Sequence, residues 1–299
     1  MLPRSTSSLG QAVLQALAPR AWSGAAVALM LSASSLAGEN PSQLPFRLCQ
    51  EYLVVVKGAI GASEGLNFLV DTGTIRTLVD RQTIKKLGLA VLEEEVQLAS
   101  LKNGRPAQEL VVPELRFGPV EIRQARMLAT DLSFLSRSGT RIDAILGLDV
   151  LSRTSFSVDY AAKRITFVPV EDSVSAVPFH SVSPLLTIDV AIGGRAARLM
   201  VDTGAPRLTL FPNRMGARLP GFLLKGASAG QGVGGMSQLR EIELSAFSLG
   251  PTEWHHVGAL LVDVAESAYD DFDGVLSPSS LSVRCLYFDF PGKRLGWKR

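Results

Sequence analysis

Short apolar segments rich in Val, Ile and Leu recur along most of the chain, and turn-forming residues separate them. Examples are VVVKGAIG at 54–61 and TIDVAIGG at 187–194. Most of these segments are five to seven residues long, with Gly, Pro, Asn and Ser between them. Segments of this kind are typical of β-strands. The pattern therefore predicts a mostly β protein.

Two stretches depart from this pattern and predict short helices. In DRQTIKKLG at 80–88, Asp80 can cap the start of a helix and Gly88 can end it. A second short helix is expected after Gly147. Residues 170–178, VEDSVSAVP, are polar and rich in turn formers, which makes them a candidate linker.

The whole pattern repeats at a spacing of about 131 residues. The segment NFLVDTGTIRTLV contains Asp71, and ARLMVDTGAPRLTLF contains Asp202, which follows Asp71 by 131 positions. Three further pairs lie at offsets of 130 to 132: ELRFGPVEI with AFSLGPTEW, DAILGLDVLS with DGVLSPSSLS, and SVDYAAKRITF with YFDFPGKRLGW. Colinear similarity over this length indicates a tandem duplication of a domain-sized unit.

The first 37 residues differ from the rest. AWSGAAVALMLSASSLA at 21–37 is an apolar run that ends in small residues, and Arg4 and Arg20 are the only charges before Glu39. This resembles a secretory signal peptide and is short for a membrane span. We expect an exported protein, periplasmic or secreted. The alternative is an uncleaved segment that anchors it to the membrane.

These features divide the chain into five expected parts. They are a signal peptide at 1–37, an N-terminal segment at 38–48, an N-terminal lobe at 49–170, a linker at 171–182 and a C-terminal lobe at 183–299. The N-terminal segment is too short for a long pro-segment, so no large inactive precursor is expected.

Composition and charge narrow the choice of function. The chain has 30 Lys and Arg against 28 Asp and Glu, without a basic stripe, so nucleic acid is not an expected partner. His255 and His256 are adjacent and would point to opposite faces of a strand, so no metal site is expected. Export would permit a disulfide between Cys49 and Cys285, but two free thiols in apolar strands are an equal alternative.

Two homologous lobes packed about a pseudo-twofold axis would bring Asp71 and Asp202 face to face. Two carboxylates a few ångströms apart cannot both ionise, so they share one proton. The ionised carboxylate can act as a general base on a water molecule. The protonated one can act as a general acid toward the carbonyl oxygen of a substrate.

The neighbouring residues have matching roles. Gly73 and Gly204 permit a tight turn and leave backbone N–H groups free for the carboxylates. Thr72 and Thr203 carry hydroxyls that could hydrogen-bond across the lobe interface. Gly147, at the end of AILG, stands where the chain must pass close to the first turn.

The paired DTG motifs, each after an apolar strand, with ILG about 75 residues after the first, resemble those of the aspartic proteases. The resemblance covers nearly all of the chain after residue 48. It implies an all-β, bilobal acid-protease fold: two homologous β-barrel-like lobes related by pseudo-twofold symmetry. It also implies a cleft between the lobes and endopeptidase activity on a peptide or protein substrate without a cofactor. Each lobe resembles a retroviral-type subunit, and because both lie in one chain a monomer is expected.

Three positions make the two halves unequal. Thr74 can donate a hydrogen bond to the outer oxygen of Asp71, whereas Ala205 cannot do this for Asp202. Such a bond favours the ionised form, so we expect Asp71 to be the base and Asp202 the acid. Ser277 replaces the glycine expected after the second motif and could crowd the turn that holds Asp202.

The resemblance also implies a β-hairpin flap over the cleft. Residues 98–108 are the candidate in the first lobe, although they lack the tyrosine of pepsin-like flaps. The glycine-rich residues 225–239 are the candidate for a second flap. The candidate flap residues are Asn103, Gly104, Gly232 and Gly234.

Two other functions stay open. The missing flap tyrosine and Ser277 favour a protein that binds peptides but cuts them weakly or not at all, although both carboxylates are intact. GASAG at 226–230 matches the serine-hydrolase motif around Ser228, but more glycines follow where that motif needs a helix.

Overall fold

The computed structural model describes residues 42–98, 105–168, 175–180, 185–232, 235–264 and 272–299. The expected signal peptide and the candidate flap residues Asn103, Gly104 and Gly234 lie outside these ranges. Within them, no helix has both the length and the apolar character to cross a bilayer.

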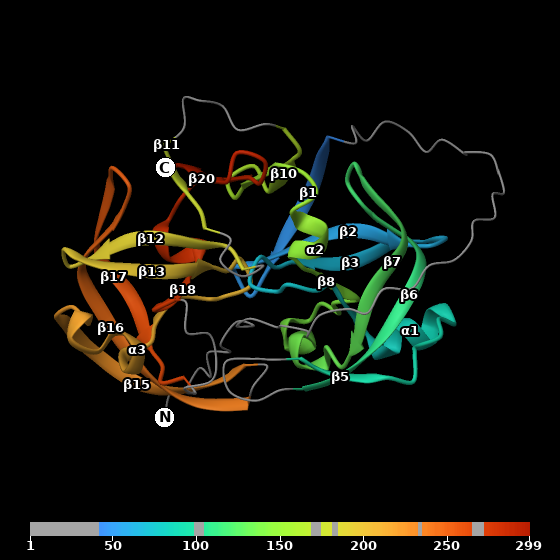
Figure 1. The fold of residues 1–299 in the computed structure, drawn as a ribbon, viewed down its shortest axis with the longest axis horizontal. Coiled ribbons are helices and arrows are strands. Elements are labelled where there is room, and N and C mark those ends of the chain that lie inside the picture. The colour runs from blue at the N-terminus through green and yellow to red at the C-terminus, as the bar shows by residue number, and fades with distance from the viewer. Residues whose placement is uncertain (1–41, 99–104, 169–174, 181–184, 233–234, 265–271) are drawn as a thin grey trace.

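The first half of the chain forms a strand-rich lobe, seen in blue to green in Figure 1. The strands pair in the order β2-β3-β8-β4-β7-β6-β5, and β2 also pairs with β6. The strands are β2 (Leu53–Ile60), β3 (Ser63–Val70), β4 (Leu78–Asp80), β5 (Glu95–Leu98), β6 (Arg105–Phe117), β7 (Val120–Thr130) and β8 (Ala144–Leu146). The helices are α1 (Arg81–Leu87), α2 (Leu148–Leu151) and the 3₁₀ helix η1 (Ser133–Ser138).

The second half repeats this topology strand for strand. Its order is β12-β13-β18-β14-β17-β16-β15, with β12 also paired with β16. The strands are β12 (Thr187–Ile192), β13 (Arg195–Val201), β14 (Leu208–Leu210), β15 (Phe222–Gly232), β16 (Gly235–Leu249), β17 (Thr252–Leu261) and β18 (Gly274–Leu276). The helical segments are α3 (Pro212–Met215), η2 (Gly216–Arg218) and η3 (Pro278–Leu281). The duplication read from the sequence is therefore a duplication of the fold.

Both halves contribute strands to one shared sheet, in the order β11-β20-β19-β9-β10-β1. Its strands are β1 (Gln43–Cys49), β9 (Phe156–Asp159), β10 (Arg164–Thr166), β11 (Ser175–Pro178), β19 (Cys285–Asp289) and β20 (Arg294–Lys298). The two halves meet where β9 pairs with β19, and there Phe156 stacks on Phe288 with ring centroids 4.9 Å apart. Because the predicted linker contains β11, it is in part a structural element of this sheet.

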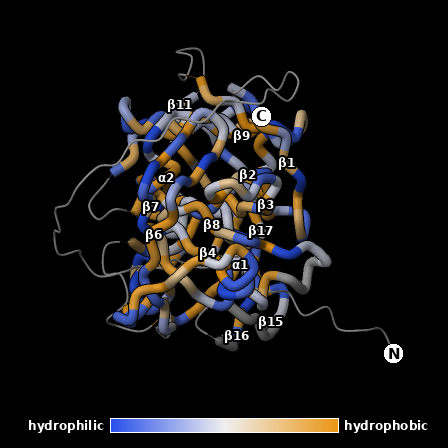
Figure 2. Tube along the Cα trace, turned by 90° about the vertical axis from the view of Figure 1, so that its right-hand side faces the viewer, coloured by the Kyte–Doolittle hydropathy of each residue, from blue (hydrophilic) through white to orange (hydrophobic). Residues whose placement is uncertain are grey.

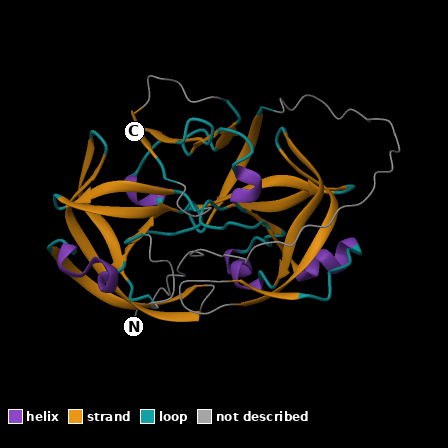
Figure 3. Ribbon diagram, in the orientation of Figure 1, coloured by secondary structure: helices purple, strands orange, loops and turns teal. Residues whose placement is uncertain are grey.

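Burial follows the apolar pattern that predicted the strands. The short strands β4, β8, β14 and β18 are buried along their whole length. Figure 2 shows β4, β8 and α1 near the middle of the view, and Figure 1 shows that α1 lies at the outer edge of the first lobe, on the right. Figure 3 shows how few helices accompany the strands. Strands β8 and β18 pair with β3 and β13, which lead into the two DTG turns, and β4 and β14 follow those turns.

The two predicted short helices are present. Gly88 ends α1 in the left-handed conformation, at φ 64°, and its N–H donates to the carbonyls of Ile84 and Lys85. Asp80 stands at the start of α1, but its carboxylate makes no cap. It accepts instead from the N–H of Leu132, at 3.1 Å, and from Arg141. The predicted side-chain cap is therefore wrong. The second helix, α2, follows Gly147 as expected.

The two cysteines are buried free thiols, so the disulfide alternative is wrong. Cys285 lies on β19, and β9 and β10 separate this strand from β1, which ends at Cys49. Three inter-strand spacings amount to roughly 14 Å, about twice the largest Cα separation that a disulfide spans. Cys49 packs instead in the core of the first lobe beside Leu53.

Candidate active site

Each DTG turn begins where a buried strand ends. Asp71 follows β3 and donates its N–H to the carbonyl of Leu146 on β8, at 3.1 Å. Asp202 follows β13 and donates its N–H to Leu276 on β18, at 2.9 Å. Both aspartates have no exposed surface. Two equivalent pairs of parallel strands therefore hold two equivalent carboxyl groups in the interior.

The two turns face each other at very short range. A Cβ added to Gly73 would lie 2.4 Å from Cγ of Asp202, and one added to Gly204 would lie 2.9 Å from Cγ of Asp71. Neither glycine has a positive φ. Glycine is thus needed less for the shape of the turn, as the sequence suggested, than for room for the opposite carboxyl group.

Thr72 and Thr203 join the two lobes as the sequence suggested. The N–H of Thr72 donates to Oγ1 of Thr203 at 3.1 Å, and the N–H of Thr203 donates to Oγ1 of Thr72 at 3.2 Å. Each hydroxyl then donates across the interface, from Thr72 to the carbonyl of Val201 at 2.9 Å and from Thr203 to that of Val70 at 2.8 Å. Four buried hydrogen bonds therefore fix one turn against the other.

The two carboxyl groups have unequal surroundings. Oδ1 of each accepts an N–H, from Gly73 at 2.9 Å and from Gly204 at 2.7 Å. Oδ2 of Asp71 also accepts the hydroxyl of Thr74, at 3.0 Å. Oδ2 of Asp202 is buried, and no donor from the described residues faces it. A protonated Asp202, which can itself donate, suits this position better than an ionised one.

The pKa values of the pair follow from this inequality. Burial raises the pKa of Asp71 to about 6, while hydrogen bonds with Asp202, Thr74 and Gly73 lower it. Burial also raises the pKa of Asp202 well above its usual range, and the charge of Asp71 raises it further. Only the N–H groups of Gly204 and Ala205 act in the opposite direction on Asp202. Asp71 is therefore the carboxyl that ionises first.

The chain segments after β8 and β18 support the two turns differently. A Cβ at Gly147 would lie 2.8 Å from the carbonyl carbon of Arg76, so this position has no room for a side chain. The equivalent Ser277 is fully buried without crowding its turn. Its hydroxyl donates to the carbonyl of Ala205 at 2.6 Å. The expectation that Ser277 crowds the turn is therefore wrong.

Both flap candidates lie on antiparallel hairpins. Leu98 at the end of β5 pairs with Arg105 at the start of β6, and Gly232 at the end of β15 pairs with Gly235 on β16. Both β5 and β15 run along the lower side of the view in Figure 1. The connections that contain Asn103, Gly104 and Gly234 lie outside the described residues.

The remaining motifs form no site. Ser228 lies inside β15 and pairs with Leu239, so it has no strand-to-helix turn around it and the serine-hydrolase alternative is wrong. His255 and His256 are exposed, and they contact Glu253 and Glu243. Within the described part of the chain, no three His, Cys, Asp or Glu side chains form a cluster that could hold a metal ion.

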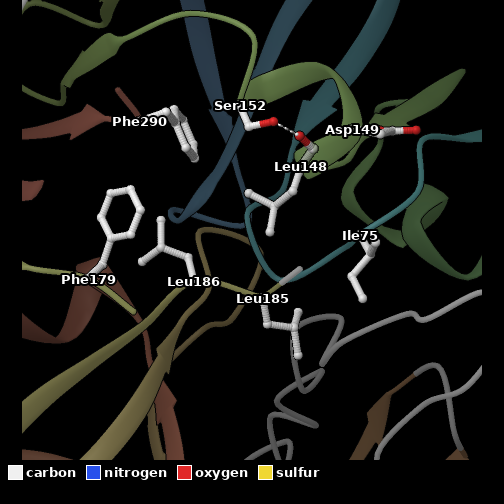
Figure 4. Close-up of a pocket in the computed structure, with 8 residues that line it drawn as sticks. All are labelled: Ile75, Leu148, Asp149, Ser152, Phe179, Leu185, Leu186 and Phe290. Atoms are coloured by element: carbon white, nitrogen blue, oxygen red, sulfur yellow. Dashed lines mark hydrogen bonds between the residues drawn. The ribbon is translucent and has the colours of Figure 1, made fainter. Parts of the chain in front are cut away.

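A cavity of about 320 Å³ lies between α2, the turn after Asp71 and the chain that enters β12. Figure 4 shows that Ile75, Leu148 and Leu185 line it with other apolar side chains. The two dyad carboxyls are not among its lining groups. Its lining carboxyl, Asp149, is already engaged by the hydroxyl and N–H of Thr77. The cavity therefore adds no group to the dyad.

Sequence reasoning missed three side chains that hold the turns. Asp149 accepts two hydrogen bonds from Thr77, and Ser279 and Ser280 contact the chain after Asp202. The signal was present in the repeat, because LGLDV in the first half aligns with LSPSS in the second. A comparison of those two segments for lost and gained donors would have found them.

Comparison with known proteins agrees with this geometry. A family model described as aspartyl protease matches twice, at residues 56–150 and 188–281, and the chain belongs to this family. The crystal structure of an aspartic proteinase from Irpex lacteus superposes with a TM-score of 0.54 at 14% identity, covering 86% of this chain and 96% of that one. That likeness shows the two-lobed fold. No curated protein matches the chain.

Proposed function

We propose that the protein is an aspartic endopeptidase that hydrolyses peptide bonds with Asp71 and Asp202 as a catalytic dyad. The observation that carries this proposal is the close approach of two buried carboxyl groups whose hydrogen-bond partners differ. One proton shared by such a pair supplies a general base and a general acid in the same site.

In the proposed reaction, a water molecule lies between the two carboxyl groups. Ionised Asp71 takes one proton from this water as its oxygen attacks the carbonyl carbon of the scissile bond. Asp202 gives its proton to the carbonyl oxygen, so the tetrahedral intermediate carries no net charge. When the C–N bond breaks, Asp71 returns its proton to the leaving nitrogen. Asp202 recovers a proton from the hydroxyl of the intermediate as the carbonyl re-forms.

Three further features belong to this proposal. The substrate is a peptide or protein chain that lies between the lobes under the hairpins β5–β6 and β15–β16. The protein acts as a monomer, because both half-sites lie in one chain. It acts outside the cytoplasm, since residues 1–37 read as a signal peptide.

The test is cleavage of a mixed peptide library from pH 3 to pH 8 by the full chain and by Asp71→Asn and Asp202→Asn. Both variants should lose cleavage, and the wild type should show a bell-shaped pH profile. Asp263→Asn, which alters an exposed aspartate, is the matched control and should cut normally. A statine-type transition-state mimic should bind the wild type, whereas a fluorophosphonate should not label it.

A folded wild type that cuts nothing in the library but binds the statine-type mimic would contradict the enzymatic proposal. That result would favour the alternative, a protein that holds peptides between its lobes without cleaving them.

A further inference from the structure

The two halves hold their catalytic turns by different chemistry. In the first lobe the support comes from backbone N–H groups. The N–H of Leu148 donates to the carbonyl of Thr74 at 2.8 Å, and that of Asp149 donates to Ile75 at 3.0 Å. Gly147 lets these segments approach closely, since any side chain there would collide with the backbone.

The second lobe lacks the first of these donors. Pro278 stands at the place of Leu148 and has no N–H to give. The carbonyl of Ala205, equivalent to that of Thr74, accepts the hydroxyl of Ser277 instead, at 2.6 Å. The two exchanges are therefore coupled: proline removes an amide donor, and the residue before it supplies a hydroxyl in its place.

In the next two contacts, too, a serine hydroxyl of the second lobe stands where the first lobe uses a different group. Oγ of Ser279 lies 2.8 Å from the carbonyl of Pro206, where the first lobe uses the amide of Asp149. The N–H of Leu208 donates to the hydroxyl of Ser280 at 2.6 Å, where the first lobe uses the carboxylate of Asp149. Three serines thus take over the contacts that Leu148 and Asp149 make in the other half.

The number of hydroxyl hydrogens limits which of the contacts among these serines can be hydrogen bonds at the same time. Oγ of Ser277 also lies 2.7 Å from Oγ of Ser279, so two hydroxyl hydrogens face three short contacts. The contact with Ala205 is buried, whereas Ser279 is exposed and the carbonyl of Pro206 can turn to water. The bond from Ser277 to the carbonyl of Ala205 is therefore the inner, buried end of this chain of hydroxyl contacts, and Ser279 is its exposed outer end.

This carbonyl matters because of the residue that carries it. The N–H of Ala205 donates to the backbone carbonyl of Asp202 at 3.4 Å, and the same N–H lowers the pKa of the Asp202 carboxyl group. The bond from Ser277 holds the carbonyl of Ala205 in place, so it restricts the backbone rotation of the residue whose N–H closes the turn onto Asp202. The support of Ser277 reaches Asp202 through this single residue.

We propose that Ser277 is a positioning residue for the acid Asp202, and that its hydroxyl replaces the backbone donor lost at Pro278. This inference rests on the proposed peptidase function and extends it to a residue at which the two halves differ.

The experiment compares Ser277→Gly with the double variant Ser277→Gly/Pro278→Leu in the full chain. The single variant has neither hydroxyl nor amide, and the double variant has the amide arrangement of the first lobe. Ser277→Gly should lower kcat by about tenfold, the value of one hydrogen bond, with little change in KM. The double variant should recover most of this loss.

The pH profile separates positioning from a merely structural role. Asp71 is the titratable group that acts on Asp202, so the upper limb of the profile reports Asp202. Without the aligned N–H of Ala205, the ionised form of Asp202 loses a donor and this limb moves to higher pH, by about half a unit. The double variant should return the limb to its wild-type position.

Two more variants keep the test decisive if the double variant does not fold. Ser277→Ala should reproduce the loss in kcat and the shifted limb. Ser279→Ala removes only the outer end of the chain and should have clearly smaller effects on both. Equal effects of these two variants, an unmoved limb, or a Ser277→Gly protein as active as wild type would each overturn the proposal.

A wild type that cleaves nothing would reject the peptidase function without deciding this inference. In that case the pH dependence of the free energy of unfolding gives information on Asp202. A raised folded-state pKa of its carboxyl group makes the free energy of unfolding depend on pH. Ser277→Gly should extend the loss of stability to higher pH, and the double variant should reverse this. The absence of that pattern would reject the inference by itself.

Discussion

At the scale of single residues, one hydroxyl makes the surroundings of the two carboxyl groups unequal. Thr74 donates to Oδ2 of Asp71, whereas Oδ2 of Asp202 has no donor among the described residues because Ala205 carries no hydroxyl. The N–H bonds to Oδ1 of the two carboxyl groups and the bonds between Thr72 and Thr203 are nearly equivalent. The proposed division of roles therefore rests on the difference between Thr74 and Ala205.

Exchange of this hydroxyl should move one limb of the pH profile at a time. Thr74→Val keeps the buried shape but removes the donor, so the pKa of Asp71 should rise and the acidic limb should shift up by about one unit. Ala205→Ser should give Asp202 a donor, lower its pKa and move the upper limb down. The measurement is kcat/KM as a function of pH. Movement of the wrong limb in either variant would reverse the assignment.

The two glycines should tolerate no side chain. Gly73→Ala would place a methyl group 2.4 Å from Cγ of Asp202, and Gly204→Ala would place one 2.9 Å from Cγ of Asp71. Because the carboxyl groups must separate, kcat/KM should fall by about 100-fold or more. Gly258→Ala is the matched control, since open space surrounds that position. Retained activity in Gly73→Ala would show that the dyad is wider than described.

At the scale of elements, the two lobes are joined beneath the dyad by side chains of one residue type. Thr72 and Thr203 each accept an N–H from the opposite turn and donate to a carbonyl on the opposite strand. This arrangement is reciprocal, so removal of either hydroxyl leaves partners of both lobes unsatisfied.

Thr72→Val and Thr203→Val should each lower the free energy of unfolding by about 2 kcal/mol or more, because a buried N–H and a buried carbonyl lose their partner. The double variant should lose less than the sum of the two, since the residues share one network. Urea unfolding followed by fluorescence measures all three. Thr72→Ser is the control that keeps the hydroxyl. Strictly additive losses would contradict a reciprocal network.

At the scale of the whole molecule, burial of two carboxyl groups makes stability depend on pH. The pKa of Asp71 is about 6 in the folded state, against an ordinary value of 3.8, and that of Asp202 is also raised. Groups with a raised folded-state pKa stabilise the protein below their unfolded-state pKa. They lose this contribution as pH rises through the folded-state value.

The wild type should therefore lose stability between about pH 4 and pH 7, by an amount on the order of 3 kcal/mol for Asp71. Asp71→Asn/Asp202→Asn should remove this part of the dependence, because amides do not titrate. Thermal unfolding of both proteins across this range gives the comparison. An unchanged slope in the double variant would place the titrating groups elsewhere.

Features that repeat or act locally could be read from the sequence. Asp71 and Asp202 were found because the same motif occurs twice in a duplicated chain. One copy alone would be weak evidence for a site. Gly88 was found because a left-handed helix end favours glycine through local backbone geometry alone. The cross-interface bonds of Thr72 and Thr203 followed once the two turns were placed face to face.

Features that depend on a partner distant in sequence were missed or misjudged. Asp80 has the local pattern of a helix cap, yet its carboxylate binds Leu132 and Arg141, which only the folded chain brings near. Cys49 and Cys285 are separated by the order of strands in the shared sheet. Ser277 was judged by its size, because its acceptor, the carbonyl of Ala205, lies 72 positions earlier.

The sequence by itself determined the duplication, the β character of each half and the two paired carboxyls proposed as the dyad, because apolar periodicity and repeated motifs are one-dimensional. Only the tertiary structure decided how the halves interlock in the shared sheet and which donor reaches which oxygen. It also decided that serine hydroxyls replace missing amides beneath Asp202. Hydrogen bonds act over about 3 Å, so their partners are known only when the chain has brought them together.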